Sequence, residues 1–340
     1  MVPAGLMVLA TASAFLQQDV RLSGPVSGWV YDPPTKSIRT VAGMPGAAVL
    51  GRAAFTDLAW ASVAPAAAAS SGKAVAALAL REEGGALTAL RADGTETTVD
   101  GWEPVAAGLP RLMAWSENGS RAILVLDARD ARVISITGDS VAASRLPLVE
   151  SEAAAKITSI AASRDEWFAS VAGAGIYRSR FDSPSEPTLL TPSASAEDAV
   201  LALDSARNVV YALEREAGIL WRVSSTNGEA TVLSQEAAVL AGSTAIGVAT
   251  SGRQLLVARG TSDRKLHRLD LEAMTWSEVP YGLDGAPGTM FAPLSRAGVF
   301  LLGLRGSEQE ALYLWDESAD SVFFVPAAAQ AAVAAGVDGQ

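Results

Sequence analysis

A two-part unit that recurs seven times along the 340 residues constrains the fold of this chain more than any other feature. Each copy consists of a run of alternating apolar residues, a polar turn and a second alternating run. The copies lie at residues 29–41, 87–99, 133–146, 176–190, 219–233, 266–279 and 312–325. Recurrence of this kind indicates small modules that must stack on their neighbours to bury a core.

The spacing of the copies is nearly constant. The residues that end the first run of each copy are separated by steps of 59, 46, 45, 42, 46 and 46. These residues are Asp32, Arg91, Thr137, Asp182, Ser224, Asp270 and Asp316. A period of about 45 residues is typical of one blade of a β-propeller.

Local chemistry predicts that each copy is a β-hairpin. Alternation at a period of two places successive side chains on opposite faces of a strand. The segments between the runs are rich in Pro, Gly, Asn, Asp and Ser, which favour turns. A second pair of short apolar runs precedes six of the seven copies, most clearly at residues 112–115 and 122–126. The repeat therefore predicts four strands per module.

We expect an all-β fold: a seven-bladed β-propeller of four-stranded antiparallel blades, with six blades plus an N-terminal hairpin as the alternative. The first hairpin, at residues 29–41, is predicted to be the outer half of the blade that closes the ring. Either the residues that precede it or residues 327–337 would complete that blade. The segment between Val41 and Asp57 is interpreted as a loop insertion.

The recurring strand that ends in Asp reads WVYD at 29, SRFD at 179, HRLD at 267 and YLWD at 313. With the strand that follows each turn, this pattern resembles the YVTN/lactonase-like and WD-repeat-like propellers of secreted or periplasmic bacterial proteins. The resemblance covers residues 26–326. It implies a propeller and an extracytoplasmic compartment.

The two ends of the chain are predicted to lie outside the propeller domain, which we place at residues 19–326. Residues 6–15 are apolar, and Ala12-Ser13-Ala14 has the small-residue form of a signal-peptidase site. Residues 1–18 are therefore interpreted as a signal-like leader, with an N-terminal strand as the alternative, and the protein as periplasmic or secreted. Residues 327–340 are interpreted as an alanine-rich tail.

Composition narrows the possible functions. A formal charge of −11 argues against nucleic acid as the main partner. The absence of cysteine excludes thiolate chemistry, and a single histidine, His267, excludes a His-rich metal site. Many of the 66 alanines are expected where neighbouring blades approach closely, because their side chains are small. We expect no cofactor and no catalytic set.

The residues that recur in the repeat have structural interpretations. His267 is expected to be a structural residue of a third strand, and the aspartates that end strands are expected to cap turns rather than to bind metal. Lactonase-like propellers bind a channel cation through Glu, Asn and Asp, but the three asparagines here fall in predicted turns. Five tryptophans at alternating positions are expected to pack between blades. For Trp60, Trp102 and Trp276 the sequence does not decide between core and surface.

Residues that lead into the innermost strands are expected to rim one mouth of the central channel. Acidic, basic and hydroxyl side chains together at this mouth would either bind a polar ligand or be ordinary solvent-exposed residues at the edge of the sheets. The six candidates are Asp57, Arg111, Lys156, Asp198, Ser243 and Thr289.

Three functions remain open at this point. The leading hypothesis is a monomeric, non-enzymatic scaffold outside the cytoplasm that binds a protein or polymer on its loop faces, without a transmembrane span. The alternatives are a lactonase-like hydrolase with a metal in the channel and a sensor of small ligands. Because a propeller supports many functions, only the site can discriminate among them.

Overall fold

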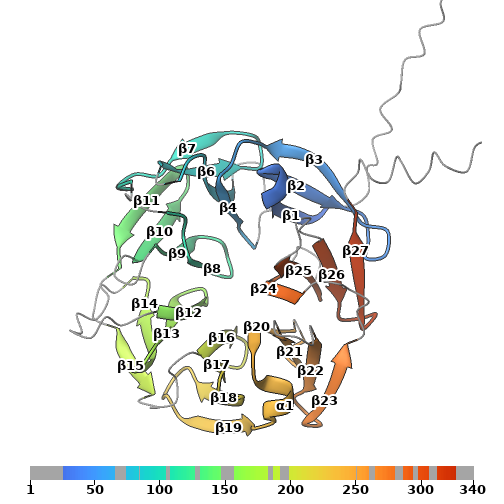
Figure 1. Cartoon of the computed structure of the whole chain (residues 1–340). Helices are drawn as coiled ribbons and strands as arrows, with labels where there is room; N and C mark the ends of the chain where they lie inside the picture. Colours follow the sequence, from blue (N-terminus) through green and yellow to red (C-terminus); the bar gives the residue numbers. More distant parts are fainter. Residues whose placement is uncertain are drawn as a thin grey trace, which may run out of the picture.

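The chain forms a ring of seven antiparallel sheets (Figure 1). The computed structural model describes residues 26–65, 74–83, 85–104, 108–126, 131–146, 157–182, 187–191, 199–249, 251–259, 265–279, 286–293, 298–305 and 312–326. Six sheets have four strands, and the first has three within these residues. The protein is a seven-bladed β-propeller, so the main prediction is confirmed and the six-blade alternative is wrong.

The strands follow one another from the centre of each blade to its rim. Blade 1 contains β1 (Val26–Asp32), β2 (Ser37–Ala42) and β3 (Val49–Phe55). Blade 2 contains β4 (Trp60–Val63), β5 (Val75–Leu80), β6 (Leu87–Arg91) and β7 (Glu96–Thr98). Blade 3 contains β8 (Leu112–Trp115), β9 (Arg121–Val125), β10 (Ala131–Thr137) and β11 (Ser140–Arg145).

The remaining four blades repeat this order. Blade 4 contains β12 (Ile157–Ala162), β13 (Glu166–Val171), β14 (Gly175–Arg180) and β15 (Thr188–Thr191). Blade 5 contains β16 (Ala199–Asp204), β17 (Val209–Glu214), β18 (Ile219–Ser224) and β19 (Ala230–Ser234). Blade 6 contains β20 (Ser243–Val248), β21 (Gln254–Arg259), β22 (Leu266–Asp270) and β23 (Thr275–Val279). Blade 7 contains β24 (Ala286–Pro293), β25 (Val299–Arg305), β26 (Leu312–Asp316) and β27 (Ser321–Val325).

Antiparallel pairing gives the ring two distinct ends. We call the end at which β4, β8, β12, β16, β20 and β24 begin the entry face, because the chain enters each new blade there. The opposite end is the turn face. It carries the turn between the first and second strands of a blade and the turn between the third and fourth, such as residues 163–165 and 225–229.

Blade 1 differs from the prediction. The segment interpreted as a loop insertion contains β3, which pairs with β2 through Ile38↔Phe55 and Val41↔Leu50. In Figure 1, β3 lies on the rim of the ring, as β7 and β27 do. The hairpin at 29–41 is therefore not the outer half of a blade, because the rim position belongs to β3.

The correction changes where the first strand-ending aspartate lies. With β3 at the rim, β1 takes the second position in its blade and ends on the entry face, whereas β14, β22 and β26 end on the turn face. Measured from Ala42, the end of β2, the step to Arg91 is 49 residues and not 59. Hydrophobic alternation reveals a strand but not its rank within a sheet. The segments predicted to complete this blade, before residue 26 and at 327–337, lie outside the described residues.

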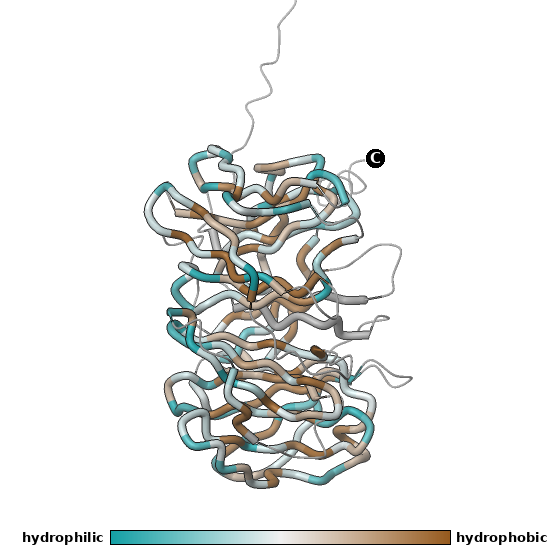
Figure 2. Tube along the Cα trace, turned by 90° about the vertical axis from the view of Figure 1, so that its left-hand side faces the viewer, coloured by the Kyte–Doolittle hydropathy of each residue, from teal (hydrophilic) through white to brown (hydrophobic). Residues whose placement is uncertain are grey.

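Seven of the eight hydrophobic clusters of the described residues lie between two neighbouring blades. Trp315 is fully buried and contacts Phe300 with ring centroids 5.5 Å apart, in a cluster shared by blades 6 and 7. The ring closes in the same way, because Val30 and Leu50 of blade 1 pack with Leu314 of blade 7. Figure 2 shows the hydrophobic residues along the strands and the hydrophilic ones at the turns. Neighbouring blades thus supply the shielding that a single sheet lacks.

Helices are minor in the described residues. They comprise a 3₁₀ turn, η1 (Pro33–Thr35), and one short helix, α1 (Ala237–Leu240). Within the described ranges, no helix has the length and apolar character needed to cross a membrane.

Candidate ligand-binding site

Two of the predicted rim residues lie exposed on the entry face. Asp57 has a left-handed backbone, with φ of 58°, and its carboxylate accepts a hydrogen bond of 2.9 Å from the hydroxyl of Thr56. Arg111 donates a hydrogen bond of 3.0 Å to the carbonyl oxygen of Ile157, which begins the next blade. Each side chain is engaged by its own local contact, and its role at a channel rim stays a prediction.

Of the other four candidates, one is buried, and the side chains of three lie outside the described part of the molecule. Ser243 begins β20, is buried, and its hydroxyl donates to the carbonyl oxygen of Leu240 over 2.6 Å. Thr289 lies within β24, and its side chain is outside the described part of the molecule. Lys156 and Asp198 also lie outside the described residues. The proposal of a ligand ring at this mouth stays a prediction.

The single histidine lies in the third strand of blade 6, as expected. His267 is 8% exposed and faces Val257 and Glu278 as its strand partners in β21 and β23. It therefore sits within the sheet, between its neighbours in β21 and β23.

Two of the strand-ending aspartates cap turns as predicted. Asp270 accepts hydrogen bonds from the backbone amides of Ala273 and Glu272 at 2.8 and 2.9 Å, and these bonds hold the pKa of Asp270 below its ordinary value. Asp316 accepts from two amides in the equivalent turn of blade 7. The other two differ: Asp182 pairs with an arginine of blade 3, and Asp32 accepts from the hydroxyl of Thr35.

The asparagines also behave as turn residues. Asn208 has φ of 54°, and the side-chain oxygens of Asn118 and Asn227 each accept a backbone amide at 3.1 Å, from Ser120 and Glu229. Across the ranges that the structure describes, no three His, Asp or Glu side chains are grouped so that they would hold a metal ion.

On the turn face, an arginine of one blade repeatedly reaches a turn of the next blade. We call these residues the interblade arginines. They join five successive pairs of blades, from blades 2 and 3 to blades 6 and 7. The contacts are Arg91 to the carbonyl of Asp139 at 3.0 Å, Arg121 to Asp182 at 2.9 Å, Arg178 to the carbonyl of Thr226 at 3.1 Å, Arg207 to the carbonyl of Gly252, and Arg268 to Asp320. The turn face is thereby held by polar contacts as well as by the core.

A cavity of about 370 Å³ opens on the same face, where turns of blades 3, 4 and 5 meet. We call it the turn-face pocket. Nine of its eleven lining residues are polar or charged. They are Glu117, Ser163, Arg164, Asp165, Glu166, Arg180, Ser205, Asn208 and Ser225, and the two apolar ones are Phe168 and Leu203.

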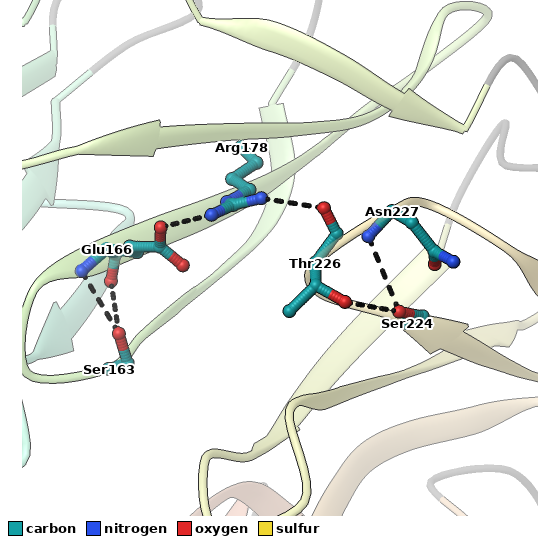
Figure 3. Close-up of polar contacts among 6 residues, drawn as sticks. All are labelled: Ser163, Glu166, Arg178, Ser224, Thr226 and Asn227. Carbon is teal, nitrogen blue, oxygen red and sulfur yellow. Dashed lines mark hydrogen bonds and ion pairs between the residues drawn. The ribbon is translucent and has the colours of Figure 1, made fainter.

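Hydrogen bonds fix one wall of the pocket. The hydroxyl of Ser163 accepts from the backbone amide of Glu166 at 3.0 Å and donates to its carbonyl oxygen at 3.2 Å, which closes the turn between β12 and β13 (Figure 3). Arg178 forms an ion pair with the Glu166 carboxylate and also binds the carbonyl of Thr226. Blades 4 and 5 are thus locked together beside the cavity.

Other polar groups of the pocket have no partner within the described residues. Ser225 is 5% exposed, and although its amide donates to the carbonyl of Asn208 at 2.9 Å, its hydroxyl makes no hydrogen bond. The buried hydroxyl of Ser205 is also unpaired. A buried polar group that lacks a hydrogen bond costs about 1–3 kcal/mol, and a ligand that supplies the bond recovers this free energy.

Four further side chains that line the turn-face pocket are charged. Arg164 and Arg180 have no carboxylate partner among the described residues, and Glu117 and Asp165 have no cationic one. All four are exposed at the mouth. The pocket therefore presents two unpaired cations and two unpaired anions around unpaired hydroxyls.

Sequence reasoning did not find this pocket. Its residues come from four turns of three blades and from the adjoining strands. Each of these turns resembles an ordinary polar turn, and the predicted rim lies on the opposite face. The recurrence of a Ser at the start of the first turn of blades 3, 4 and 5, at Ser116, Ser163 and Ser205, is the signal that marks these turns as equivalent. Which turns border a cavity depends on how the blades pack.

Comparison with known proteins identifies the fold and nothing narrower. No family model matches the chain, and no curated protein has a matching sequence. The β-propeller domain of Cps50 (Swd1) from Myceliophteria thermophila is similar, with a TM-score of 0.55 and 12% identity over 86% of this chain and 97% of that chain. A chain of a nidogen/laminin complex has a TM-score of 0.48 and 12% identity over 73% and 90%. The chain is a β-propeller whose architecture is similar to that of Cps50 (Swd1).

Proposed function

We propose that this protein is a non-enzymatic binding scaffold that holds a protein or polymer partner on its turn face, at the turn-face pocket. The observation that carries the proposal is the buried, unpaired hydroxyl of Ser205 in the lining of a cavity that also has unpaired charges of both signs. Polar groups in this state are complementary to a ligand that brings donors and acceptors of its own.

The surroundings of the pocket support a binding role. The Ser163–Glu166 turn and the contacts of Arg178 hold the wall in one arrangement, so the ligand does not have to order it. A preorganised site loses less conformational entropy when it binds.

We also propose that the scaffold acts outside the cytoplasm as a monomer. Support for the compartment comes from the apolar residues 6–15 and from Ala12-Ser13-Ala14, which lie outside the described residues. Expression of the full chain followed by fractionation and N-terminal sequencing tests this. Cleavage near residue 14 and recovery from the periplasm or medium are expected, and an intact chain in the cytoplasm would contradict the proposal.

Retention of a partner from extracts of the source cells tests the scaffold role. The full chain is compared with a pocket variant, Glu117→Gln with Arg164→Gln and Arg180→Gln, and with an entry-face variant, Asp57→Asn with Arg111→Gln. The proposal expects a partner that the wild type and the entry-face variant retain and the pocket variant loses. If only the entry-face variant loses its partner, the predicted channel rim is the site; if no variant retains anything, the scaffold role is wrong.

A further inference from the structure

The charge balance of the turn-face pocket restricts its ligand. Among the lining side chains, Arg164 and Arg180 oppose Glu117 and Asp165, and the charge of Glu166 is neutralised by Arg178. An anionic ligand would meet the two free carboxylates, and a cationic ligand would meet the two free guanidinium groups. A ligand that is itself charged gains little from such a site.

The hydrogen-bonding capacity of the lining residues restricts the ligand further. Guanidinium groups only donate and carboxylates only accept, whereas hydroxyls do both. A phosphate or carboxylate on the ligand would satisfy Arg164 and Arg180 but leave Glu117 and Asp165 without donors. Closely spaced hydroxyl groups satisfy all four, because each donates one hydrogen bond and accepts others.

The small apolar part of the lining is consistent with the same chemistry. Only Phe168 and Leu203 are apolar, so the pocket has no separate apolar subsites for the side chains of a peptide. Phe168 is almost fully buried in the core between blades 4 and 5, so only a small apolar area is left for the C–H groups of a sugar ring. The volume of about 370 Å³ lies within the range of small-ligand sites.

We propose that the turn-face pocket binds a neutral saccharide, as one or more units of a polyhydroxylated chain. The hydroxyls of Ser205 and Ser225 bind the buried edge of the sugar, and the four unpaired charged residues bind its exposed hydroxyls. This inference rests on the proposed function, because it names the kind of polymer that the scaffold holds.

Isothermal titration of the full chain with defined hexamers tests the inference. The neutral probes are maltohexaose, cellohexaose, laminarihexaose and xylohexaose. The charged probes are hexagalacturonate and the chitosan hexamer, and a Gly-Ser hexapeptide represents proteins. We expect at least one neutral hexasaccharide to bind more tightly than every charged or peptide probe.

Variants locate the binding. Ser225→Ala and Arg180→Gln are each expected to weaken the neutral hexasaccharide at least 10-fold. Arg253→Gln, which changes an exposed arginine in the corresponding turn of blade 6, is the matched control and is expected to change affinity less than 2-fold. Circular dichroism melting of each variant shows whether it is folded.

The outcomes distinguish a failure of the saccharide proposal from a failure of the scaffold role. Binding of charged oligomers or of the peptide alone, no binding of any probe, or sugar binding that the pocket variants leave unchanged would each overturn the saccharide proposal. The scaffold role fails separately, when neither the wild type nor any variant retains a partner in the extract experiment.

Discussion

Arg178, in the third strand of blade 4, donates a hydrogen bond of 3.1 Å to the backbone carbonyl of Thr226 in blade 5. The same guanidinium group pairs with Glu166 in its own blade. Because four other junctions on the turn face use an arginine in the same way, the contact belongs to a pattern that runs around most of the ring. This pattern also determines the wall of the turn-face pocket.

Replacement of Arg178 by Met is expected to lower the free energy of unfolding by about 1–2 kcal/mol, since it leaves Glu166 and the Thr226 carbonyl without a partner in a partly exposed position. Urea denaturation measures the change. The control is Arg180→Met on the same strand, which removes an exposed, unpaired arginine and should cost under about 0.5 kcal/mol. Equal losses in the two variants would mean that the interblade contact adds no stability.

Gly228 is expected to tolerate no side chain. Its φ is +76°, and a Cβ atom there would lie 1.9 Å from the carbonyl oxygen of Leu190 in the neighbouring blade. Gly173 has a similar φ of +72° but open space around it. Gly173→Ala should cost about 1–2 kcal/mol for the left-handed backbone, and Gly228→Ala about 1–3 kcal/mol more for the clash. Thermal denaturation of both compares them, and similar melting temperatures would contradict the close approach of blades 4 and 5.

Asp270 is expected to contribute to the pH dependence of stability. Its folded-state pKa is below the ordinary value of 3.8, so its contribution is complete above that value and is lost as the pH falls through the lower, folded-state pKa. Asp270→Asn should therefore be less stable than the wild type at pH 7, and the gap should narrow as the pH is lowered below 4.

Denaturation at a series of pH values measures this gap. Glu272→Gln is the control, since it removes another acid of the same turn whose carboxylate makes no hydrogen bond among the described residues. A gap between Asp270→Asn and the wild type that stays constant from pH 7 to pH 3 would show that the amide hydrogen bonds do not favour the charged form.

Trp167 is the largest side chain buried between blades 3 and 4, with 2% exposed. Trp167→Ala is expected to lower stability by about 3–5 kcal/mol, because it leaves a cavity that the rigid sheets cannot fill. Phe324, with 50% exposed and a contact to Tyr313, is the control, and its alanine variant should lose about 1 kcal/mol or less. A small loss at Trp167 would indicate that the blades repack.

Most of the fold was predictable because its signals are local. The six hairpins from residue 87 onward correspond to β6–β7, β10–β11, β14–β15, β18–β19, β22–β23 and β26–β27. Alternation and turn chemistry act within about ten residues of chain, and a propeller repeats them seven times. Blade 1 was misassigned because Asp32 has the same local sequence as the third-strand aspartates, and only the pairing of β2 with β3 reveals its rank.

The candidate site was much less predictable. Position along the repeat determines the end of the ring at which Asp57 and Arg111 lie, but their role as ligand-binding residues of a channel rim stays a prediction. The turn-face pocket needed the packing of three blades, since Ser205 reads as a turn residue in the sequence and only the folded structure leaves its hydroxyl buried without a hydrogen bond.

The sequence by itself determined the strand pairs within the modules and the capping of individual turns, because these depend on residues that are neighbours in the chain. It favoured seven modules, and the structure decided between seven and six. The tertiary structure decided the rank of β1, the arginine contacts between blades and the existence of the turn-face pocket. These depend on groups such as Arg178 and Thr226, 48 residues apart, whose approach follows from the packing of blade on blade. The pattern of apolar and polar residues along the chain does not indicate which residues so far apart in the sequence come into contact.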